Sequence, residues 1–291
     1  MLRKFLGKFK RTLISWLVRF SYLDNITEND KIIDERINSS QDKFLTQGYS
    51  IKKNFLNEEE IKIFQNFFIN KKLFDEKFIY LMNFVENKFK PMIKNFLGDD
   101  FILMGFIVAR TTKDTKSLSD AWHTDSVGHK INFHICVEGD GSIPTLYLPE
   151  SHKKKYFPSI IDEFRDIYKI SQNSTVKNRK IAFEHTAGDC TLFDANGKHI
   201  GVYKNAKKVR KLIFLEFMNK KKYEELKTQD NKKNPFRLQL KMPYRDSKDL
   251  YSFQIIEDDI LHRLEKFDFF SKTILKEYEN KMYFQKSVVD I

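Results

Sequence analysis

Five short apolar runs, separated by turn signals, follow one another between residues 101 and 217. They read FILMGFIVAR, INFHICV, PTLYLP, CTLFD and VRKLIFLEF. Runs of this length and spacing are typical of the strands of a β-sandwich or barrel. A Lys-rich, partly helical insertion over residues 153–180 interrupts the series. The pattern therefore predicts a β core, with helices on either side of it in the sequence.

Helical patterns precede the β region. Asn57 followed by Glu60 has the spacing of a capping box and predicts that a helix begins there. Its buried stripe is expected at Ile61, Phe64 and Phe68. A second helix is expected within residues 76–97, ended by Gly98 and two aspartates.

The segments that flank this core are more polar. Residues 21–43 predict a linker or irregular segment, and Lys220–Lys222 form a cationic run of the kind that usually faces solvent. A helical pattern returns at about residues 258–281. We therefore expect an α+β protein in three parts: residues 1–40, a basic amphipathic helix and linker; residues 41–218, the β-rich domain; and residues 219–291, a Lys-rich, partly helical extension that packs on the core.

Composition narrows the class of protein. Hydrophobic residues make up 41% of the 291 residues, which is enough for a packed core and excludes wholesale disorder. A net charge of +12 favours anionic partners, such as nucleic acid, a membrane surface, or a phosphorylated or carboxylated substrate. Cys136 and Cys190 are the only cysteines, so a reducing cytoplasm fits better than a disulfide scaffold. No apolar run approaches the roughly 20 residues of a membrane-spanning helix.

Residues 1–20 carry six cations and no acid, and their apolar side chains follow a helical stripe. This pattern is typical of a helix that lies in a membrane interface. It fits equally well an N-terminal helix docked on the body of the protein. We keep both interpretations, and the first places the protein in the cytoplasm at the inner membrane face.

The segment Trp122-His123-Thr124-Asp125 contains candidate metal ligands and is the most informative about function. On a strand, His123 and Asp125 point to the same face and can bind one metal ion together. Alone, the pair is equally well an ordinary surface pair. His199 supplies a third candidate ligand. Two histidines and one carboxylate on one face are the ligand set of non-haem Fe(II) oxygenases, which leaves open positions for a 2-oxo acid and O2.

Arg210 follows His199 after a turn and begins a predicted strand. A guanidinium group is suited to binding the distal carboxylate of 2-oxoglutarate through two contacts. Taken by itself, Arg210 is equally suited to an ion pair with Asp189 or Glu216. Arg110 is a further candidate for the C1 carboxylate of the co-substrate or for an anionic substrate, with a structural salt bridge as the alternative.

In order and spacing, these motifs resemble the phytanoyl-CoA dioxygenase-like group of Fe(II)/2-oxoglutarate oxygenases. The resemblance runs from Phe44 to Phe217 through QGYSIKKNFLNEEEI, WHTD, GDGSIPTLYLPESHK, a GD-x-x-LF strand, His199 and Arg210. It implies a double-stranded β-helix, or jelly-roll, core. It also implies that His123, Asp125 and His199 bind Fe(II), that Arg210 binds 2-oxoglutarate, and that O2 is consumed.

The chain departs from the family pattern at Gly201, where the family often has a serine that helps to hold 2-oxoglutarate. Tyr203 and Thr191 are the residues that we expect to compensate. Asn132 alternates with His134 and Cys136 on one run, so these side chains either contact 2-oxoglutarate or substrate in the barrel interior or pack there. We expect the remaining histidines at the surface, behind the ligands or in a turn: His129, His152, His185 and His262.

Three functions compete. The first is hydroxylation of an anionic small-molecule, lipid-linked or glycan substrate. The carboxylate Asp125 favours it, because related halogenating enzymes have a small residue at that position. The second is a non-catalytic jelly-roll module that binds a glycan or a membrane surface. The third is a cupin-like metalloenzyme without 2-oxoglutarate, against which Arg210 argues. No nucleic-acid-binding signature is present, so a nucleic-acid partner is not expected.

One measurement, sedimentation with lipid vesicles, distinguishes the two interpretations of residues 1–20. If the segment is an interfacial helix, a variant lacking residues 1–20 should no longer sediment with anionic lipid vesicles, because the apolar stripe and the cations bind together. Neutral vesicles are the control for the charge contribution. Equal sedimentation of the truncated and full-length proteins would contradict the anchor.

Overall fold

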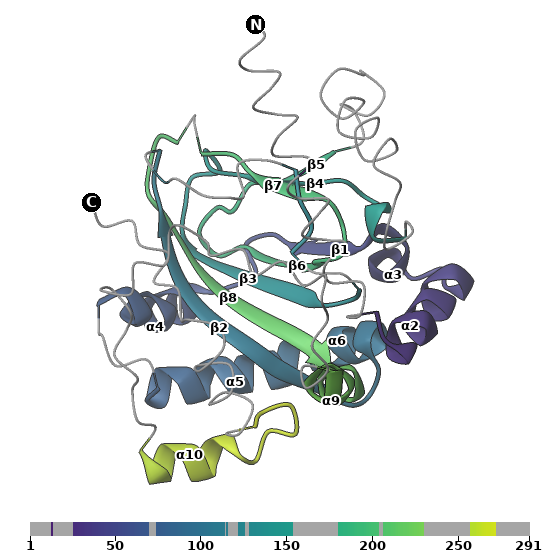
Figure 1. The fold of residues 1–291 in the computed structure, drawn as a ribbon. Coiled ribbons are helices and arrows are strands. Elements are labelled where there is room, and N and C mark those ends of the chain that lie inside the picture. Colours follow the sequence, from purple (N-terminus) through teal and green to yellow (C-terminus); the bar gives the residue numbers. More distant parts are fainter. Residues whose placement is uncertain are drawn as a thin grey trace, which may run out of the picture.

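Two antiparallel sheets form the centre of the protein (Figure 1). The structure, a computed structural model, describes residues 26–69, 74–113, 115, 122–125, 128–153, 180–203, 206–229 and 257–271, together with residue 13. The larger sheet has the strand order β1 (Tyr49–Lys52), β6 (Cys190–Asp194), β3 (Ile131–Glu138), β8 (Arg210–Asn219) and β2 (Phe101–Thr111). The smaller sheet has the order β5 (Ile181–Phe183), β4 (Thr145–Tyr147) and β7 (His199–Gly201).

The path of the chain through these sheets defines the fold. After β2 and β3 in the larger sheet, the chain crosses to β4 and β5, returns to β6, crosses to β7, and ends in β8 between β3 and β2. Every strand pair is antiparallel. This alternation between two facing sheets is the double-stranded β-helix, so the expected α+β jelly roll is confirmed. The insertion expected over residues 153–180 lies, except for its two end residues, outside the described residues.

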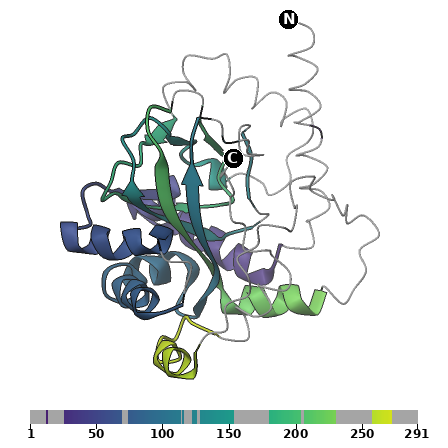
Figure 2. The ribbon, with the colours of Figure 1, turned by 90° about the vertical axis from the view of Figure 1, so that its left-hand side faces the viewer.

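Helices cover the outer face of the larger sheet. Their bounds are α2 (Glu28–Ser39), α3 (Lys43–Gln47), α4 (Glu58–Ile69), α5 (Glu76–Lys88), α6 (Lys90–Leu97), α9 (Lys220–Gln229) and α10 (Asp258–Leu264). Helix α4 contacts β3, α6 contacts β2 and β8, and α10 packs on α5. Figure 2 shows this helical layer from the side, with α4 and α5 on one face of the sheet. Among the described residues, none of the helices has the length and apolar character needed to cross a membrane.

Strand β3 is buried on both faces because it lies between the helices and the barrel interior. Ile131, Phe133 and Ile135 belong to the core shared with the helices, where the Phe133 and Phe89 rings lie 4.5 Å apart. Successive side chains of a strand point to opposite faces, so Asn132 and the residues in register with it face the other sheet. Burying one phenylalanine side chain contributes about 1.5–3 kcal/mol, so this aromatic layer fixes the helices on the sheet.

Helix α4 begins as the sequence predicts. Asn57 N donates to Glu60 Oε2 at 2.9 Å and Glu60 N donates to Asn57 Oδ1 at 2.8 Å, which together form a capping box. Of the predicted stripe, Phe64 is buried, whereas Ile61 and Phe68 are half-buried and pack against the core. Phe67, which the prediction left out, is buried as well. The helical region that we expected within 76–97 is divided into α5 and α6, which meet at Phe89.

The prediction of an irregular segment over residues 21–43 is wrong, because α2 and α3 form there. Thr27 N donates to Asp30 Oδ2 at 2.9 Å, and the two residues make a capping box at the start of α2. Ile33 and Ile37, one helical turn apart, are buried. The polarity of the segment hid the helix, since Ile33 and Ile37 are its only buried apolar residues.

A buried network of charges joins α2 to α9 and β6. Lys222 Nζ lies 2.7 Å from Asp30 Oδ1, and both side chains are at most 1% exposed. The prediction that the Lys220–Lys222 run faces solvent is therefore wrong for Lys222. His129, also fully buried, contacts Asp194 Oδ2 through Nδ1 at 2.5 Å and Asp34 Oδ1 through Nε2 at 3.0 Å. Buried charges are tolerated only when paired in this way.

The described part of the C-terminal segment returns to the helical layer. Helix α10 ends at Leu264, earlier than the helical pattern predicted, and residues from 272 onward lie outside the described residues. Phe269 stacks on Phe101 with 5.6 Å between ring centroids. The ion pair between Arg263 and Glu76 joins α10 to α5.

The charge on His129 predicts how stability depends on pH. Burial alone lowers the pKa of His129, but the carboxylates of Asp194 and Asp34 outweigh burial and raise the pKa from 6.5 to about 9. The folded protein therefore binds this proton more tightly than the unfolded chain. The stabilisation is complete below the unfolded value and is lost as the pH rises through the folded value. We expect His129→Gln to lower the free energy of unfolding by on the order of 1–3 kcal/mol near pH 6, and by less near pH 10.

Urea unfolding of both proteins at the two pH values measures this difference. His262→Gln is the matched control, because His262 is exposed on α10. An equal loss of stability at both pH values would show that packing, and not the charge of His129, is what the substitution removes.

Candidate metal centre

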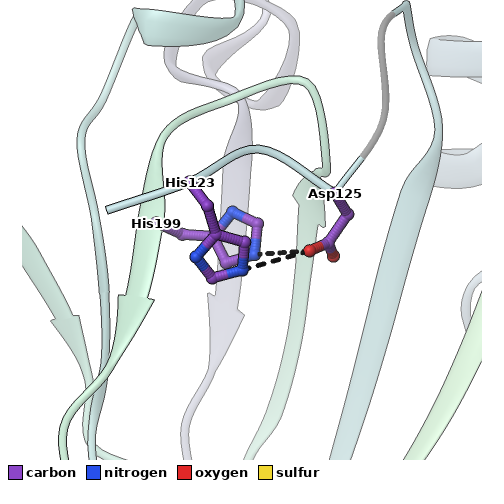
Figure 3. Close-up of side chains that lie close together, drawn as sticks. All are labelled: His123, Asp125 and His199. Atoms are coloured by element: carbon purple, nitrogen blue, oxygen red, sulfur yellow. Dashed lines mark ion pairs between the residues drawn. The ribbon is translucent and has the colours of Figure 1, made fainter. Parts of the chain in front are cut away.

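Three side chains converge at one end of the smaller sheet (Figure 3). His123 Nε2 lies 3.2 Å from Asp125 Oδ1, and His199 Nε2 lies 3.3 Å from the same oxygen. One ligand atom from each of the three residues lies within 4.8 Å of the others. Within the described residues, this is the one group of His, Cys, Asp and Glu side chains with such spacing. The structure thus brings together the three metal ligands predicted from the sequence.

Backbone pairing holds the two histidines beside each other. His123 N donates to the His199 carbonyl at 3.0 Å, and His199 N donates to the His123 carbonyl at 2.9 Å. This is an isolated antiparallel bridge, so residues 122–125 follow the edge of β7 without forming a regular strand. Asp125 N donates to the Ala195 carbonyl at 3.1 Å, which fixes the third ligand to the loop after β6.

The tautomer of His199 suits a metal ligand. Its Nδ1 lies 3.0 Å from the Gly197 carbonyl oxygen, which can only accept a hydrogen bond. Nδ1 therefore carries the hydrogen, and the lone pair of Nε2 points to the centre. Gly197 is required for this arrangement, because a Cβ at that position would lie 2.0 Å from Tyr147 Oη.

The two carboxylate oxygens of Asp125 have different partners, because Asn132 contacts only one of them. Its Nδ2 donates to Asp125 Oδ2 at 2.6 Å, while Oδ1 faces both histidines. Burial alone raises the pKa of Asp125, but His199 and His123 outweigh burial and hold it well below its ordinary value. The carboxylate is therefore ionised and offers one oxygen to a metal. The sequence left Asn132 either at the co-substrate or packed in the interior, and the structure places its amide on the carboxylate of Asp125.

Arg210 begins β8, and its buried side chain faces the barrel interior. Nε donates to Thr111 Oγ1 at 3.0 Å and Nη1 donates to the Ile143 carbonyl at 2.8 Å. Burial lowers the pKa of the Arg210 guanidinium, and the electrostatic interaction with Tyr203 opposes that effect. The Thr111 hydroxyl group and the Ile143 carbonyl are uncharged, so neither of them neutralises the guanidinium cation.

The acids that we named as alternative partners of Arg210 pair elsewhere. Asp189 Oδ2 lies 2.8 Å from Lys53 Nζ, and Glu216 Oε2 lies 3.2 Å from Lys130 Nζ. No carboxylate of the described residues forms an ion pair with Arg210. Burying a cation without an ion pair costs free energy unless an anion binds beside it.

Two further residues line the interior between the metal ligands and Arg210. His134 on β3 pairs in register with Thr191 on β6, and both face the smaller sheet. Burial, Arg210 and His199 together lower the pKa of His134 well below its ordinary value, so the ring is neutral. The structure therefore brings Thr191, a predicted co-substrate residue, to the interior face, without a hydrogen bond to Arg210.

The structure does not bring Arg110 to this centre. Its side chain is exposed, and along β2 it alternates onto the face of Phe106 and Val108, which belong to the helix-covered core. The neighbouring Thr111 faces inward and binds Arg210 instead. Sequence reasoning missed Thr111, because the strand register that decides which of the two residues points inward is not visible in the sequence.

The remaining histidines occupy defined positions. His152 lies in a single 3-10 turn, Ser151–Lys153, where its Nε2 contacts the Leu45 carbonyl at 2.8 Å. His185 Nε2 lies 3.2 Å from Thr145 Oγ1, in the interior beside His134. Both are buried, and neither belongs to the group of side chains that could hold a metal ion.

The contact between Asn132 and Asp125 predicts an effect on metal affinity. Partners behind a metal ligand typically contribute about 10–100-fold in affinity, so Asn132→Ala should weaken Fe(II) or Co(II) binding by that factor. Anaerobic equilibrium dialysis measures the affinity. Asn95→Ala, an exposed position on α6, is the control. Unchanged affinity would mean that Asp125 needs no partner to hold its orientation.

No model of a protein family matches the sequence, and no curated protein matches it. Solved structures that it is similar to include the non-haem α-ketoglutarate-dependent epimerase SnoN from nogalamycin biosynthesis, with a TM-score of 0.46, 12% identity, and coverage of 65% of this chain and 84% of that one. HygX from Streptomyces hygroscopicus, with nickel and 2-oxoglutarate bound, has a TM-score of 0.46 and 14% identity, over 67% of this chain and 87% of that one. EctD from S. alaskensis, with bound Fe, has a TM-score of 0.47 and 13% identity, and the similarity covers 67% of this chain and 77% of that one. At 12–14% identity, the activity of this chain has to be argued from its own residues.

Proposed function

We propose that this chain is an Fe(II)- and 2-oxoglutarate-dependent dioxygenase that hydroxylates its substrate. One observation carries the proposal: a two-histidine, one-carboxylate group and a buried arginine face the same barrel interior, and no carboxylate of the described residues forms an ion pair with that arginine. The ligand set suits Fe(II), and it leaves coordination positions open. The arginine supplies the charge that a dicarboxylate co-substrate needs at its far end.

The residues present fit the metal and the co-substrate by their chemistry. His199 presents an unprotonated Nε2, and Asn132 leaves one oxygen of Asp125 for a metal. When bound, Fe(II) supplies the activation of O2 that is coupled to the oxidative decarboxylation of 2-oxoglutarate to succinate. The chain binds and orients the reactants, with Arg210 holding the distal carboxylate. The Phe193 ring, 5.1 Å from that of His199, helps to keep water from the centre.

The substrate that we propose is an anionic small molecule or an anionic lipid- or glycan-linked one. The net charge of +12 supports this class. The loops expected to select the substrate, residues 111–121 and 153–187, lie largely outside the described residues. We also retain the proposal that residues 1–20 contact the inner membrane face, although this segment too lies outside the described residues except for residue 13.

A spectroscopic titration tests the proposed function. Under anaerobic conditions, addition of 2-oxoglutarate to the Fe(II)-loaded protein should produce a metal-to-ligand charge-transfer band. His199→Ala should lose the band because a ligand is missing. Arg210→Ala should keep the band but require about 10–100-fold more 2-oxoglutarate, since a hydrogen bond to a charged group contributes about 1.5–3 kcal/mol.

Arg110→Ala is the matched control, because it removes an exposed arginine from the opposite face of β2. It should leave the titration unchanged. An unchanged affinity in Arg210→Ala would favour a metalloenzyme that does not use 2-oxoglutarate. Failure of the wild-type protein to retain Fe(II) or form the band would instead favour a non-catalytic binding module.

A further inference from the structure

The loop between β6 and β7, residues 195–198, carries two carbonyl groups that orient candidate metal ligands. The Ala195 carbonyl accepts a hydrogen bond from Asp125 N at 3.1 Å, and the Gly197 carbonyl lies 3.0 Å from His199 Nδ1. Two of the three ligands are therefore positioned by this loop. Whether their side chains face the same point depends on the conformation of the loop, so the question is what fixes it.

Asp194, the last residue of β6, fixes the start of the loop. Its Oδ1 accepts a hydrogen bond from Asn196 N at 2.9 Å, which closes an Asx turn. The N–H group of Asn196 and the carbonyl of Ala195 belong to one planar, trans peptide unit, so they point in opposite directions. The Asp194 carboxylate holds one side of this peptide unit, and Asp125 N binds the other. A rotation of the peptide unit would break both bonds.

His129 holds the second oxygen of Asp194. Its Nδ1 lies 2.5 Å from Asp194 Oδ2, and both side chains are fully buried. On the other side of the ring, Nε2 lies 3.0 Å from Asp34 Oδ1. Ionised carboxylates only accept, so both ring nitrogens donate. Because each oxygen of Asp194 has its own donor, the carboxylate cannot turn away from Asn196 without losing the contact with His129.

Helices α2 and α9 fix His129 in turn. Its backbone N donates to Asp30 Oδ1 at 2.7 Å, and Lys222 Nζ lies 2.7 Å from the same oxygen and 3.3 Å from the His129 carbonyl. Gly128, with a φ of +86°, precedes the ring, and a Cβ there would lie 2.6 Å from Asp30 Oδ1. A glycine is therefore required for the two helices to come this close. A continuous chain of buried polar contacts thus runs from these helices to the peptide unit that binds Asp125.

The rest of the loop is held by neutral groups. Asn196 Nδ2 donates to the His152 carbonyl at 2.9 Å, and Lys198 N donates to Ser151 Oγ at 2.7 Å. A hydrogen bond to an ionised acceptor is about twice as strong as one between neutral groups. The bond to the Asp194 carboxylate is therefore the strongest of these restraints, and it lies next to the carbonyl that binds Asp125.

We propose that His129 and Asp194 are positioning residues that orient Asp125 for metal binding. They act through the peptide unit that joins Ala195 to Asn196. The inference rests on the proposed function, because it takes Asp125 as a metal ligand. It adds that the packing of α2 and α9 against the barrel determines the affinity for the metal ion, so the buried charges do more than stabilise the fold.

Two substitutions of His129 test the inference in the full-length protein. Asparagine carries an N–H group at the δ position, so His129→Asn can still donate to Asp194, whereas His129→Leu cannot. Both variants lose the contact with Asp34 and should be less stable in urea. Because a hydrogen bond to a charged group contributes about 1.5–3 kcal/mol, His129→Leu should raise the Kd of Co(II) about 10–100-fold. His129→Asn should bind Co(II) like wild type. Equilibrium dialysis measures both values.

A second measurement uses the protein without metal. Amide hydrogen exchange by NMR should show that the Asp125 amide exchanges faster in His129→Leu than in wild type or His129→Asn, because its bond to the Ala195 carbonyl opens more often. If His129→Leu fails to fold, Asp194→Ala takes its place, since His129 can then lose its proton and leave no unpaired charge. Asp194→Asn is the matched control, because its amide oxygen still accepts from Asn196 N.

The outcomes separate the inference from the proposed function. Equal increases of the Co(II) Kd in His129→Leu and His129→Asn would follow the loss of stability alone and would overturn the inference. Wild-type affinity and exchange in His129→Leu would overturn it as well, while the proposed function stands. If wild type binds no Co(II), the proposed function fails, and the exchange rate of the Asp125 amide still decides whether the two residues position Asp125.

Discussion

The candidate centre depends on one pair of backbone hydrogen bonds between His123 and His199. These residues come from distant parts of the chain, and their reciprocal bonds of 3.0 and 2.9 Å set the two imidazole rings side by side. Asp125 is added by a third backbone bond, to the loop that precedes His199. The two histidines are therefore positioned by β7 of the smaller sheet, and Asp125 by the loop that leads from β6 of the larger sheet to β7.

Polar groups are buried in two regions of the protein, with different consequences. At the junction of α2, α9 and β6, Asp30, Lys222, His129 and Asp194 satisfy one another, and the network stabilises the fold. In the barrel interior, among the residues that the structure describes, the buried Arg210 side chain has neutral hydrogen-bond partners and His134 Nδ1 has no partner. Such groups cost free energy in the protein alone, and they persist where a ligand completes them. This contrast, more than the presence of any one residue, distinguishes a binding interior from an ordinary core.

Predictions from the sequence were correct where the structure depends on residues that are close together in the chain. The short apolar runs became strands, because strands buried on both faces need continuous apolar or small side chains. The capping box at Asn57 and Glu60 formed, because it depends on neighbours in the chain. Predictions failed where distant partners decide the outcome. Residues 28–39 look polar but form a helix, and Lys222 looks solvated but is buried against Asp30, since neither partner is visible locally.

The sequence by itself determined the fold class and named the candidate metal ligands His123, Asp125 and His199, because strand periodicity, side-chain chemistry and the order of motifs can all be read along the chain. Tertiary structure alone decided which neighbouring residues face the interior. It directed Thr111 inward and Arg110 outward, placed Asn132 on the carboxylate of Asp125, and set Tyr203 in the space left by Gly201. The reason is that a shift of one residue in strand register exchanges the two faces, and register is fixed by pairing between strands that are far apart in the chain.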